Sequence, residues 1–581
     1  MIDFEKARLF AFNELSKFNN VKLLKEKDKF GYEGFVEVWT VITEIELRPN
    51  NPEDFEFHIC IKSDFPISFP WVYLSQKDYD RIKYIPHVDT ERQICTYDRE
   101  IIRFNTDNPH SIVYNCLKKA KEIIIDGIIK KTNLSDFDEE FLAYWNNSYS
   151  KNDKINNYCL SLLSNVDSIK SKIGMFFVQF PENEFNYIFH QHDYLYERFK
   201  KYFKECKLRF SEHDILYLGE IDHKKMPSFD LVNSEAIEIV TKMGQLSEFR
   251  NYLKRKDTPA IVLFKKIIGK KEYFLGWSHD DLELDKSGFT KWERISLTTI
   301  NNHANVTRLN PCIYLPERLA ERTSGDVSKS ILKFLVAGLG SIGSNLIYFL
   351  NSLNTPEFSL VDTDILKIEN IGRHLLGFSC VNNPKIIAIE NFLHKQNPHQ
   401  KIQTEYQSIV EIVQHKTNIV NDVDYVFVAI GTGNVQSWLG DAFKNKVIKK
   451  PIFFLWVEPY LVAGHCIYLH PNDNKNYEET FDSDGFFNFN IIDKEEYTNG
   501  NKALFMKEAG CQSSYVPYAL SNIVLFLSQL FPVINSIIQN NIQHSASYTW
   551  FGSQTILRDK QIKTSKYGDS HKQGEVVRND I

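Results

Sequence analysis

The first residue whose type and setting point to chemistry is Cys95. It lies in the polar stretch IPHVDTERQICTYD, where only Ile94 is an apolar residue directly beside it. A free thiol used for packing behaves as a small hydrophobe and is expected among apolar side chains. The thiolate form of the same group is a nucleophile. The stretch therefore predicts an exposed thiol with a chemical purpose.

A glycine-rich turn is the second candidate. The segment ILKFLVAGLGSIGSNLIYFLNSL reads as a buried strand, a turn with Gly338, Gly340 and Gly343 in the pattern G-x-G-x-x-G, and an amphipathic helix. The missing side chains let backbone N–H groups approach a phosphate where the helix begins. The next strand ends in Asp362, which suits a carboxylate that accepts hydrogen bonds from ribose hydroxyls. We predict a nucleotide-binding half-fold; a glycine turn needed only for packing is the alternative.

Four polar residues after this turn indicate which nucleotide would bind. Asp364, Asn370, Arg373 and Lys385 follow within one short span. Two cations and an amide suit a triphosphate better than a nicotinamide cofactor, because the cations neutralise phosphate charge. The alternative is that each lies on a solvated face. The ordered set favours ATP.

Helices and strands must position these residues. IDFEKARLFAFNELSKF has helical periodicity, whereas FVEVWTVITEIEL and FEFHICIK alternate as paired strands do, and WVYL adds a short strand. Helical patterns follow in NPHSIVYNCLKKAKEIIIDGI and FDEEFLAYW. Cys95 is thus expected on an irregular flap between a strand meander and helices.

The polar segment WNNSYSKNDKINNY predicts a linker and a domain boundary near residue 150. We expect a multidomain chain of α/β and α+β class, with domains at 1–150, 151–310 and 311–581. The middle domain has mixed strand and helix patterns, and no catalytic constellation is evident in it.

Composition excludes several function classes. The chain has 581 residues, 69 basic and 75 acidic, and the basic residues form no long block, so neither nucleic acid nor an anionic membrane is an expected partner. Nine cysteines without a C-x-x-C pair predict no structural zinc site and reduced thiols in a cytoplasmic protein. The apolar stretch 518–538 is interrupted by polar residues and Pro532, which favours a buried helix over a membrane span.

The segment 333–439 resembles the adenylation domain of the ThiF/MoeB and ubiquitin-activating enzyme superfamily, whose GxGxxG, D-x-D, N-x-x-R and lysine elements are all present in order. The resemblance implies ATP-dependent adenylation of a protein's C-terminal carboxylate, often in a homodimer. Arg318 or Arg322 would then complete the partner's site. The family usually has a magnesium-binding aspartate where this chain has Gly433, so Asp364 is the candidate Mg²⁺ ligand.

Activating enzymes of this superfamily use a loop cysteine to take the acyl group as a thioester. Cys511, in KEAGCQSSYVPYAL, matches that role best, with a buried or incidental thiol as the alternative. Cys466 lies on an alternating strand and is expected to be structural.

Residues 1 to about 145 resemble the ubiquitin-conjugating fold, through the helix, the meander, FPISFP, a histidine in IPHVD and the cysteine in QICTYD. The resemblance implies that Cys95 receives the acyl group from Cys511 and passes it to an amine. His87 would shape the flap or polarise the thioester carbonyl, and a purely structural histidine is the alternative. Asp89 replaces the family's oxyanion-stabilising asparagine, and an anion cannot donate that hydrogen bond.

The domain order resembles fused activating and conjugating proteins of type II CBASS anti-phage operons. This implies that the partner protein activated at its C-terminus is a cGAS-like nucleotidyltransferase, joined to a target protein. Two other functions stay open: a dinucleotide-dependent oxidoreductase that uses the same glycine turn, and an inactive conjugating-like scaffold, suggested by Asp89.

Overall fold

The computed structural model divides the chain into two compact units, Met1–Tyr196 with Lys207–Ile313, and Glu197–Cys206 with Tyr314–Ile581. It describes residues 3–24, 32–48, 51–82, 85–89, 91–98, 102–130, 141–142, 145, 159–164, 166, 173–180, 187–221, 231–253, 260–268, 271–279, 303, 306–324, 331–353, 356–507 and 514–581.

The N-terminal part is an antiparallel sheet with helices. The sheet has the order β1 (Asn20–Leu23), β2 (Glu37–Arg48), β3 (Asn51–Ile61), β4 (Trp71–Leu74) and β5 (Gln93–Ile94). The helices are α1 (Phe4–Ser16), α2 (Gln76–Ile82) and α3 (Pro109–Ile125). The N-terminal helix, the strands and the α3 helix predicted from periodicity are confirmed; FDEEFLAYW lies mostly outside the described residues.

Alternation along β2 and β3 explains how this sheet packs. Trp39 and Val41 of β2 join Phe57 and Ile59 of β3 in one core with residues of α1 and α3. The intervening side chains point to the other face, where Val38 and neighbouring aromatic residues form a smaller cluster. The helix α3 begins at Pro109 after Asn108, whose side chain accepts a hydrogen bond from the Ser111 N–H.

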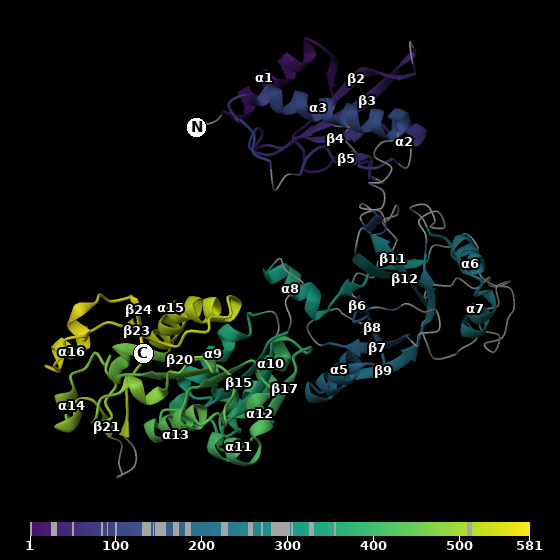
Figure 1. Cartoon of the computed structure of the whole chain (residues 1–581). Helices are drawn as coiled ribbons and strands as arrows, with labels where there is room; N and C mark the ends of the chain where they lie inside the picture. Colours follow the sequence, from purple (N-terminus) through teal and green to yellow (C-terminus); the bar gives the residue numbers. More distant parts are fainter. Residues whose placement is uncertain are drawn as a thin grey trace. The chain divides into compact units, whose positions relative to one another are not determined.

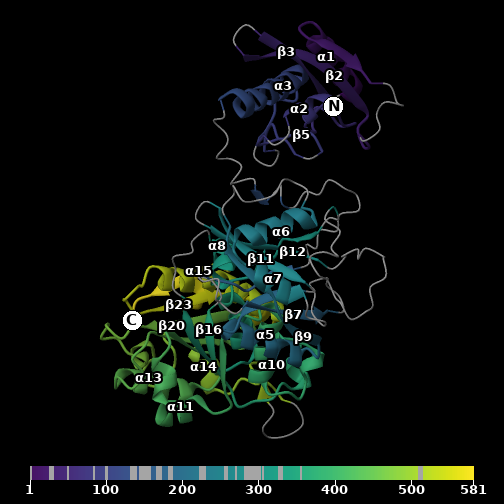
Figure 2. The ribbon, with the colours of Figure 1, turned by 90° about the vertical axis from the view of Figure 1, so that its right-hand side faces the viewer.

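The middle region contains two further sheets. One has the order β14 (Cys312–Ile313), β6 (Cys159–Ser161), β8 (Tyr187–Gln191), β7 (Ile173–Gln179) and β9 (Arg209–Asp214). The other has the order β10 (Leu216–Glu220), β11 (Ile261–Ile268), β12 (Lys271–Ser278) and β13 (Thr307–Leu309). The helices here are α5 (Tyr194–Glu205), α6 (Asn233–Lys242) and α7 (Leu246–Leu253), and α6 and α7 lie beside β11 and β12 (Figure 2).

Trp145 packs into this middle region. Its indole N–H donates a hydrogen bond to the carbonyl of Leu309 at 2.9 Å, and its ring meets Phe264 edge to face. The side chain is 4% exposed and belongs to the core that contains Trp277. The middle core therefore extends across the boundary expected near residue 150.

The C-terminal part is built on an eight-stranded sheet. Its order is β17 (Ile402–Glu405), β16 (Glu357–Val361), β15 (Lys333–Ala337), β18 (Tyr425–Val428), β19 (Ile452–Val457), β20 (Ala463–Leu469), β23 (Ala546–Phe551) and β24 (Val576–Asn579). The strands from β17 to β19 are parallel, and β20, β23 and β24 continue the sheet antiparallel. The chain thus runs outward from β15 in one direction and then returns to β18 on its other side.

Helices cover both faces of this sheet (Figure 1). One face packs against α9 (Ser341–Leu350), α10 (Lys385–Gln396) and α15 (Leu520–Gln539). The other packs against α11 (Ile409–His415), α12 (Thr417–Asn421) and α13 (Gly433–Lys444). Burial on both faces explains why strands such as KFLVA and IFFLWV are almost continuously apolar. The shorter elements are α8 (Pro316–Ser324), α14 (Lys494–Thr498), β21 (Met506–Lys507), β22 (Ser514–Tyr515) and α16 (Thr555–Asp559).

The helix α15 corresponds to the apolar stretch noted in the sequence. Within the described residues it is the one helix that is long and apolar enough to cross a membrane by length and composition. Its side chains Ile523, Phe526, Leu527, Leu530 and Ile534 belong to the core against the sheet. The helix thus packs as the buried helix that its polar interruptions predicted.

Candidate functional site

A cavity of about 500 Å³ opens beside the carboxyl ends of β15, β18 and β19. The strand order reverses between β15 and β18, and open α/β sheets bind ligands at such a reversal. The lining comes from the turn after β15, the segment 370–374, Lys385, the turn after β18, the end of β19, and residues near 477, 481 and 518. The cavity therefore joins segments from much of the C-terminal unit.

The glycine turn after β15 forms one wall. Gly338 has φ +86°, a left-handed conformation that other residues adopt only with strain. A Cβ on Gly343 would lie 1.8 Å from the Gly338 carbonyl oxygen, so the turn and α9 can approach only without that side chain. Gly340 lines the cavity, and a Cβ there would meet nothing within 4 Å. The turn leaves the N-terminus of α9 open to a ligand.

Asp362 holds the turn rather than lining the cavity. One carboxylate oxygen accepts a hydrogen bond from the Leu339 N–H at 2.6 Å, and the other accepts from the Asp364 N–H at 2.7 Å. Asp362 was predicted to accept hydrogen bonds from ribose hydroxyls. The observed contacts tie the turn after β15 to the turn after β16, and the ribose role stays a prediction.

Lys385 and Asp364 form an ion pair at the cavity edge. The Lys385 Nζ lies 2.8 Å from Asp364 Oδ2, with side chains that are 9% and 69% exposed respectively. The lysine lines the cavity at the start of α10, and its backbone N–H donates to the Asp364 carbonyl. Lys385 is thus a nearly buried cation facing the cavity, and its counter-ion is open to solvent.

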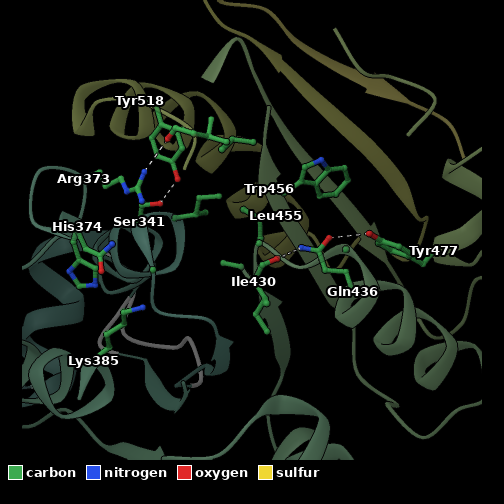
Figure 3. A pocket seen from close by; sticks show the side chains of 18 of the residues that line it. Ser341, Arg373, His374, Lys385, Ile430, Gln436, Leu455, Trp456, Tyr477 and Tyr518 are labelled. Atoms are coloured by element: carbon green, nitrogen blue, oxygen red, sulfur yellow. Dashed lines mark hydrogen bonds between the residues drawn. The ribbon is translucent and has the colours of Figure 1, made fainter. Parts of the chain in front are cut away.

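Arg373 and Asn370 also line the cavity. The Arg373 Nη1–H donates to the Val516 carbonyl at 3.1 Å, and its guanidinium lies 5.1 Å from the Tyr518 ring centroid. The Tyr518 hydroxyl is in turn 2.8 Å from Ser341 Oγ (Figure 3). The structure therefore brings Gly340, Asn370, Arg373 and Lys385 of the predicted nucleotide residues to the cavity, whereas Gly338, Gly343, Asp362 and Asp364 support them from outside its lining.

His374 lines the same end and was not predicted. Its Nδ1 accepts a hydrogen bond from the Leu376 N–H at 3.0 Å, so Nε2 carries the proton and donates to the Leu339 carbonyl at 2.8 Å. Burial lowers the pKa of His374 to about 4, which keeps the ring neutral at physiological pH. Its position directly after Arg373 was the one available sequence signal.

The opposite end of the cavity is aromatic, with Trp456, Tyr477 and Phe481 in its wall (Figure 3). Gln436 is buried and lines the cavity between Ile430 and Tyr477 (Figure 3). Its amide N–H donates to the Ile430 carbonyl at 2.7 Å, and its amide oxygen accepts from the Tyr477 hydroxyl at 3.0 Å. Gly433 also lines the cavity, and a Cβ there would meet nothing within 4 Å. No motif in the sequence predicted the aromatic end of the cavity, because its residues come from separate segments.

Cys95 lies on a small hairpin in the N-terminal part. Val88 and Ile94 form an antiparallel bridge, and the Cys95 N–H donates to the His87 carbonyl at 2.8 Å. The thiol-bearing residue is exposed, as predicted, and the backbone of His87 is left-handed, with φ 67°. The hairpin places the His87 backbone directly beside Cys95.

Asp89 closes this hairpin. Its carboxylate accepts a hydrogen bond from the Gln93 N–H at 2.7 Å, while its own N–H donates to the Gln93 carbonyl at 2.9 Å. Burial raises the pKa of Asp89 from 3.8 to about 6. The residue that replaces the family asparagine thus has a defined use in holding the turn.

Two further cysteines and two arginines were also assigned roles from the sequence. Cys511 lies outside the described residues. Cys466 is buried on β20, where burial raises the pKa of its thiol, as expected for a structural cysteine. Arg318 on α8 pairs with Glu321 at 3.3 Å, and Arg322 on the same helix is exposed.

Two families match separate parts of the chain. Residues 33–154 match the model of prokaryotic E2 family B, and residues 319–534 match the ThiF family. The chain joins an E2-like domain to a ThiF domain. The cavity lies in the ThiF domain, and the Cys95 hairpin lies in the E2-like domain.

Individual proteins resemble parts of the chain. Molybdopterin-synthase adenylyltransferase of Haemophilus influenzae is 27% identical over 100 residues, which are 16% of this chain and 41% of that protein. The solved structure of PaaA has 12% identity and a TM-score of 0.32, over 46% of this chain and 75% of its own. The structure of E. coli MccB with ATP has 15% identity and a TM-score of 0.30, over 43% and 67%.

Proposed function

We propose that this protein adenylates the C-terminal carboxylate of a partner protein with ATP and conjugates that partner to an amine of a target protein. The observation that carries the proposal is the cavity in which the glycine turn, the N-terminus of α9, Arg373 and Lys385 converge. Backbone N–H groups and two cations suit the phosphates of ATP. The name of the curated relative, an adenylyltransferase, agrees with this chemistry.

The proposed reaction proceeds by three acyl transfers after activation. A carboxylate oxygen of the partner attacks the α-phosphorus of ATP, which forms an acyl adenylate and releases pyrophosphate. The Cys511 thiolate attacks the acyl carbon and AMP leaves. The Cys95 thiolate then takes the acyl group and restores the Cys511 thiol, and the target amine finally displaces Cys95. A thiolate suits each transfer because it is a strong nucleophile whose acyl product still reacts with amines.

The E2-like hairpin supports the second half of this scheme. Cys95 is exposed, so a large acyl donor can reach it. His87 stays a candidate for shaping the flap or polarising the thioester carbonyl. Because Asp89 accepts the Gln93 N–H, oxyanion stabilisation at Cys95 has to come from other donors.

Magnesium would enter with ATP. Gly433 leaves cavity space where the family carries an aspartate, so the chain itself offers few oxygen ligands there. Asp364 is the proposed protein ligand, because its carboxylate is largely exposed and pairs with a lysine that faces the cavity. The phosphates would supply most of the remaining oxygens, as is usual for Mg²⁺ with nucleotides.

The partners and setting are proposed from the resemblance. The activated protein would be a cGAS-like nucleotidyltransferase in anti-phage defence, in the cytoplasm. The ThiF domain would act as a homodimer in which Arg318 or Arg322 reaches the partner subunit's cavity. Mixing separately inactive Arg322→Ala and Lys385→Ala chains should then restore some adenylation, which no mixture of monomers would do.

Intact mass spectrometry tests the proposal directly. The protein is incubated with its genomic neighbours, ATP and magnesium, and its mass is measured before and after a thiol reductant. We expect a reductant-labile adduct with the mass of a neighbour, which moves or disappears in Cys511→Ala and Cys95→Ala. Saturable NAD or FAD binding without ATP binding would instead favour an oxidoreductase and overturn the proposal.

A further inference from the structure

Tyr518 lies at the cationic end of the cavity and has no part in the function proposed so far. Its hydroxyl is 2.8 Å from Ser341 Oγ, and Ser341 is the first residue of α9. Its ring faces the guanidinium of Arg373 with 5.1 Å between the guanidinium carbon and the ring centroid. Figure 3 shows Tyr518, Arg373 and Ser341 side by side. One side chain thus contacts both groups that would meet the phosphates.

Arg373 is held at its guanidinium and at its backbone carbonyl. The guanidinium donates to the Val516 carbonyl at 3.1 Å, and the Arg373 carbonyl accepts from the Asn345 amide at 3.2 Å. That same amide donates to the Ser341 carbonyl at 2.7 Å. An unrestrained arginine loses side-chain entropy when it binds a ligand, and prior placement removes that cost. The aromatic face attracts the cation electrostatically and leaves most of its N–H groups open to phosphate.

We propose that Tyr518 is a positioning residue for phosphate binding, because its ring fixes the Arg373 guanidinium and its hydroxyl fixes the Ser341 side chain. The inference rests on the proposed function, in which the cavity takes ATP. Tyr518 belongs to the chain segment that follows Cys511 in the sequence. The segment after the proposed nucleophile therefore helps to build the phosphate site.

A purely structural role makes a different prediction. Tyr518 also packs against the core beneath α9 and α15, so its loss could loosen the whole cavity. A loosened cavity would bind all nucleosides and nucleotides more weakly, and by the same factor. Positioning of Arg373 affects only ligands that carry phosphates.

The test compares two probes on the full-length protein by calorimetric titration. Tyr518→Leu should weaken binding of α,β-methylene-ATP about tenfold, the size expected of a partly desolvated cation–π contact. Adenosine should bind within about twofold of wild type, because it has no phosphate for Arg373 to contact. Tyr518→Phe keeps the ring and should stay within about threefold, the size of one ordinary hydrogen bond.

A double-mutant cycle measures the coupling between Tyr518 and Arg373 in ligand binding. In an Arg373→Ala background, Tyr518→Leu should cause no more than the about threefold loss expected from the Ser341 hydrogen bond, since the ring has no guanidinium left to hold. Tyr406→Leu is the matched control, because Tyr406 is 54% exposed and lies outside the cavity. If Tyr518→Leu fails to fold, Tyr518→Met removes the aromatic face with an unbranched side chain that adapts better to the same space, and it gives the same comparison.

Three results would overturn the inference: equal weakening of both probes, unchanged binding of the triphosphate analogue, or independent effects of Tyr518→Leu and Arg373→Ala. Failure of the wild-type protein itself to bind the triphosphate analogue is a separate result. It would overturn the proposed function, and the inference with it, whereas a defect confined to the variants concerns Tyr518 alone.

Discussion

The Cys95 hairpin is closed by contacts between residues that are close in the sequence, such as the Cys95 N–H with the His87 carbonyl and Asp89 with Gln93. The ThiF cavity instead depends on contacts like that of Ser341 with Tyr518, which are 177 positions apart. The domain adds the pairing of β5 with β4 and the burial of Val88 and Ile94 in its core, but the contacts around the thiol are local, whereas the cavity exists only when the whole ThiF sheet has formed. The two sites should therefore respond differently to mutation.

The largest effect should come from Cys95→Ala. We expect loss of the final conjugate with ATP–pyrophosphate exchange unchanged, because adenylation takes place in the other domain. Gel analysis of conjugates and an exchange assay measure the two steps separately. Cys312→Ala is the control, since Cys312 is another exposed thiol. Normal conjugate formation by Cys95→Ala would remove the transfer step from the proposed function and leave a scaffold.

Lys385→Ala should weaken ATP binding in the cavity and leave the Cys95 hairpin unchanged. Loss of a charge-assisted hydrogen bond to phosphate costs roughly 1.5–3 kcal/mol, or about 10- to 100-fold in ATP affinity. The alkylation rate of Cys95 should not change. Lys367→Ala removes an exposed lysine nearby that does not line the cavity and should bind ATP normally. Equal ATP affinity in both variants would show that Lys385 does not contact the phosphates.

Gly343→Ala tests how much the cavity depends on close packing. The added Cβ would overlap the Gly338 carbonyl, and overpacking of this kind costs about 1–3 kcal/mol. We expect the unfolding midpoint of the ThiF domain to fall by roughly 5 °C, as followed by calorimetry. Gly340→Ala places its methyl group in open space and should change the midpoint much less. The reverse ranking would mean that the turn is arranged differently.

The smallest effect should come from Asp89→Asn in the hairpin. Burial raises the pKa of Asp89 to about 6, so the folded protein binds more protons than the unfolded chain between about pH 4 and 6. The charged carboxylate therefore costs stability progressively as the pH rises through that window, and the full cost remains above it. Asparagine avoids the charge and can still accept the Gln93 N–H.

We accordingly expect the Gln93 and Cys95 amides to exchange hydrogen more slowly in Asp89→Asn than in wild type at neutral pH. The two proteins should converge as the pH falls towards 4, where Asp89 is largely protonated in the folded state. Mass-spectrometric hydrogen exchange at matched pH measures this difference. Faster exchange in the variant at neutral pH would show that the hairpin needs the negative charge.

Sequence reasoning reached most of the local structure for a physical reason. Periodicity along β2, β3 and α3, and the glycines of the turn after β15, report on neighbours within a few residues. The same reasoning assigned Asp362 to ribose, but it did not predict the two backbone N–H groups from which its carboxylate accepts hydrogen bonds, because these donors become adjacent only in the fold.

The cavity residues that come from distant segments left no such pattern in the sequence. Tyr518, Tyr477 and Gln436 come from separate segments, and each is an ordinary residue in its own stretch. Asp89 departed visibly from the family pattern, yet its hydrogen bond to Gln93 depends on hairpin geometry that spacing alone does not fix. The spacing of residues in the sequence does not show which segments the folded sheet brings together.

The fixed tautomer of His374 has a thermodynamic consequence for ligand binding. Burial lowers its pKa to about 4, which leaves the ring neutral at the end of the cavity that Arg373 and Lys385 line. His374 therefore neither takes up nor releases a proton when a fully ionised nucleotide enters. Proton uptake by this ring would make the heat of nucleotide binding depend on the ionisation enthalpy of the buffer, and we expect no such contribution from His374.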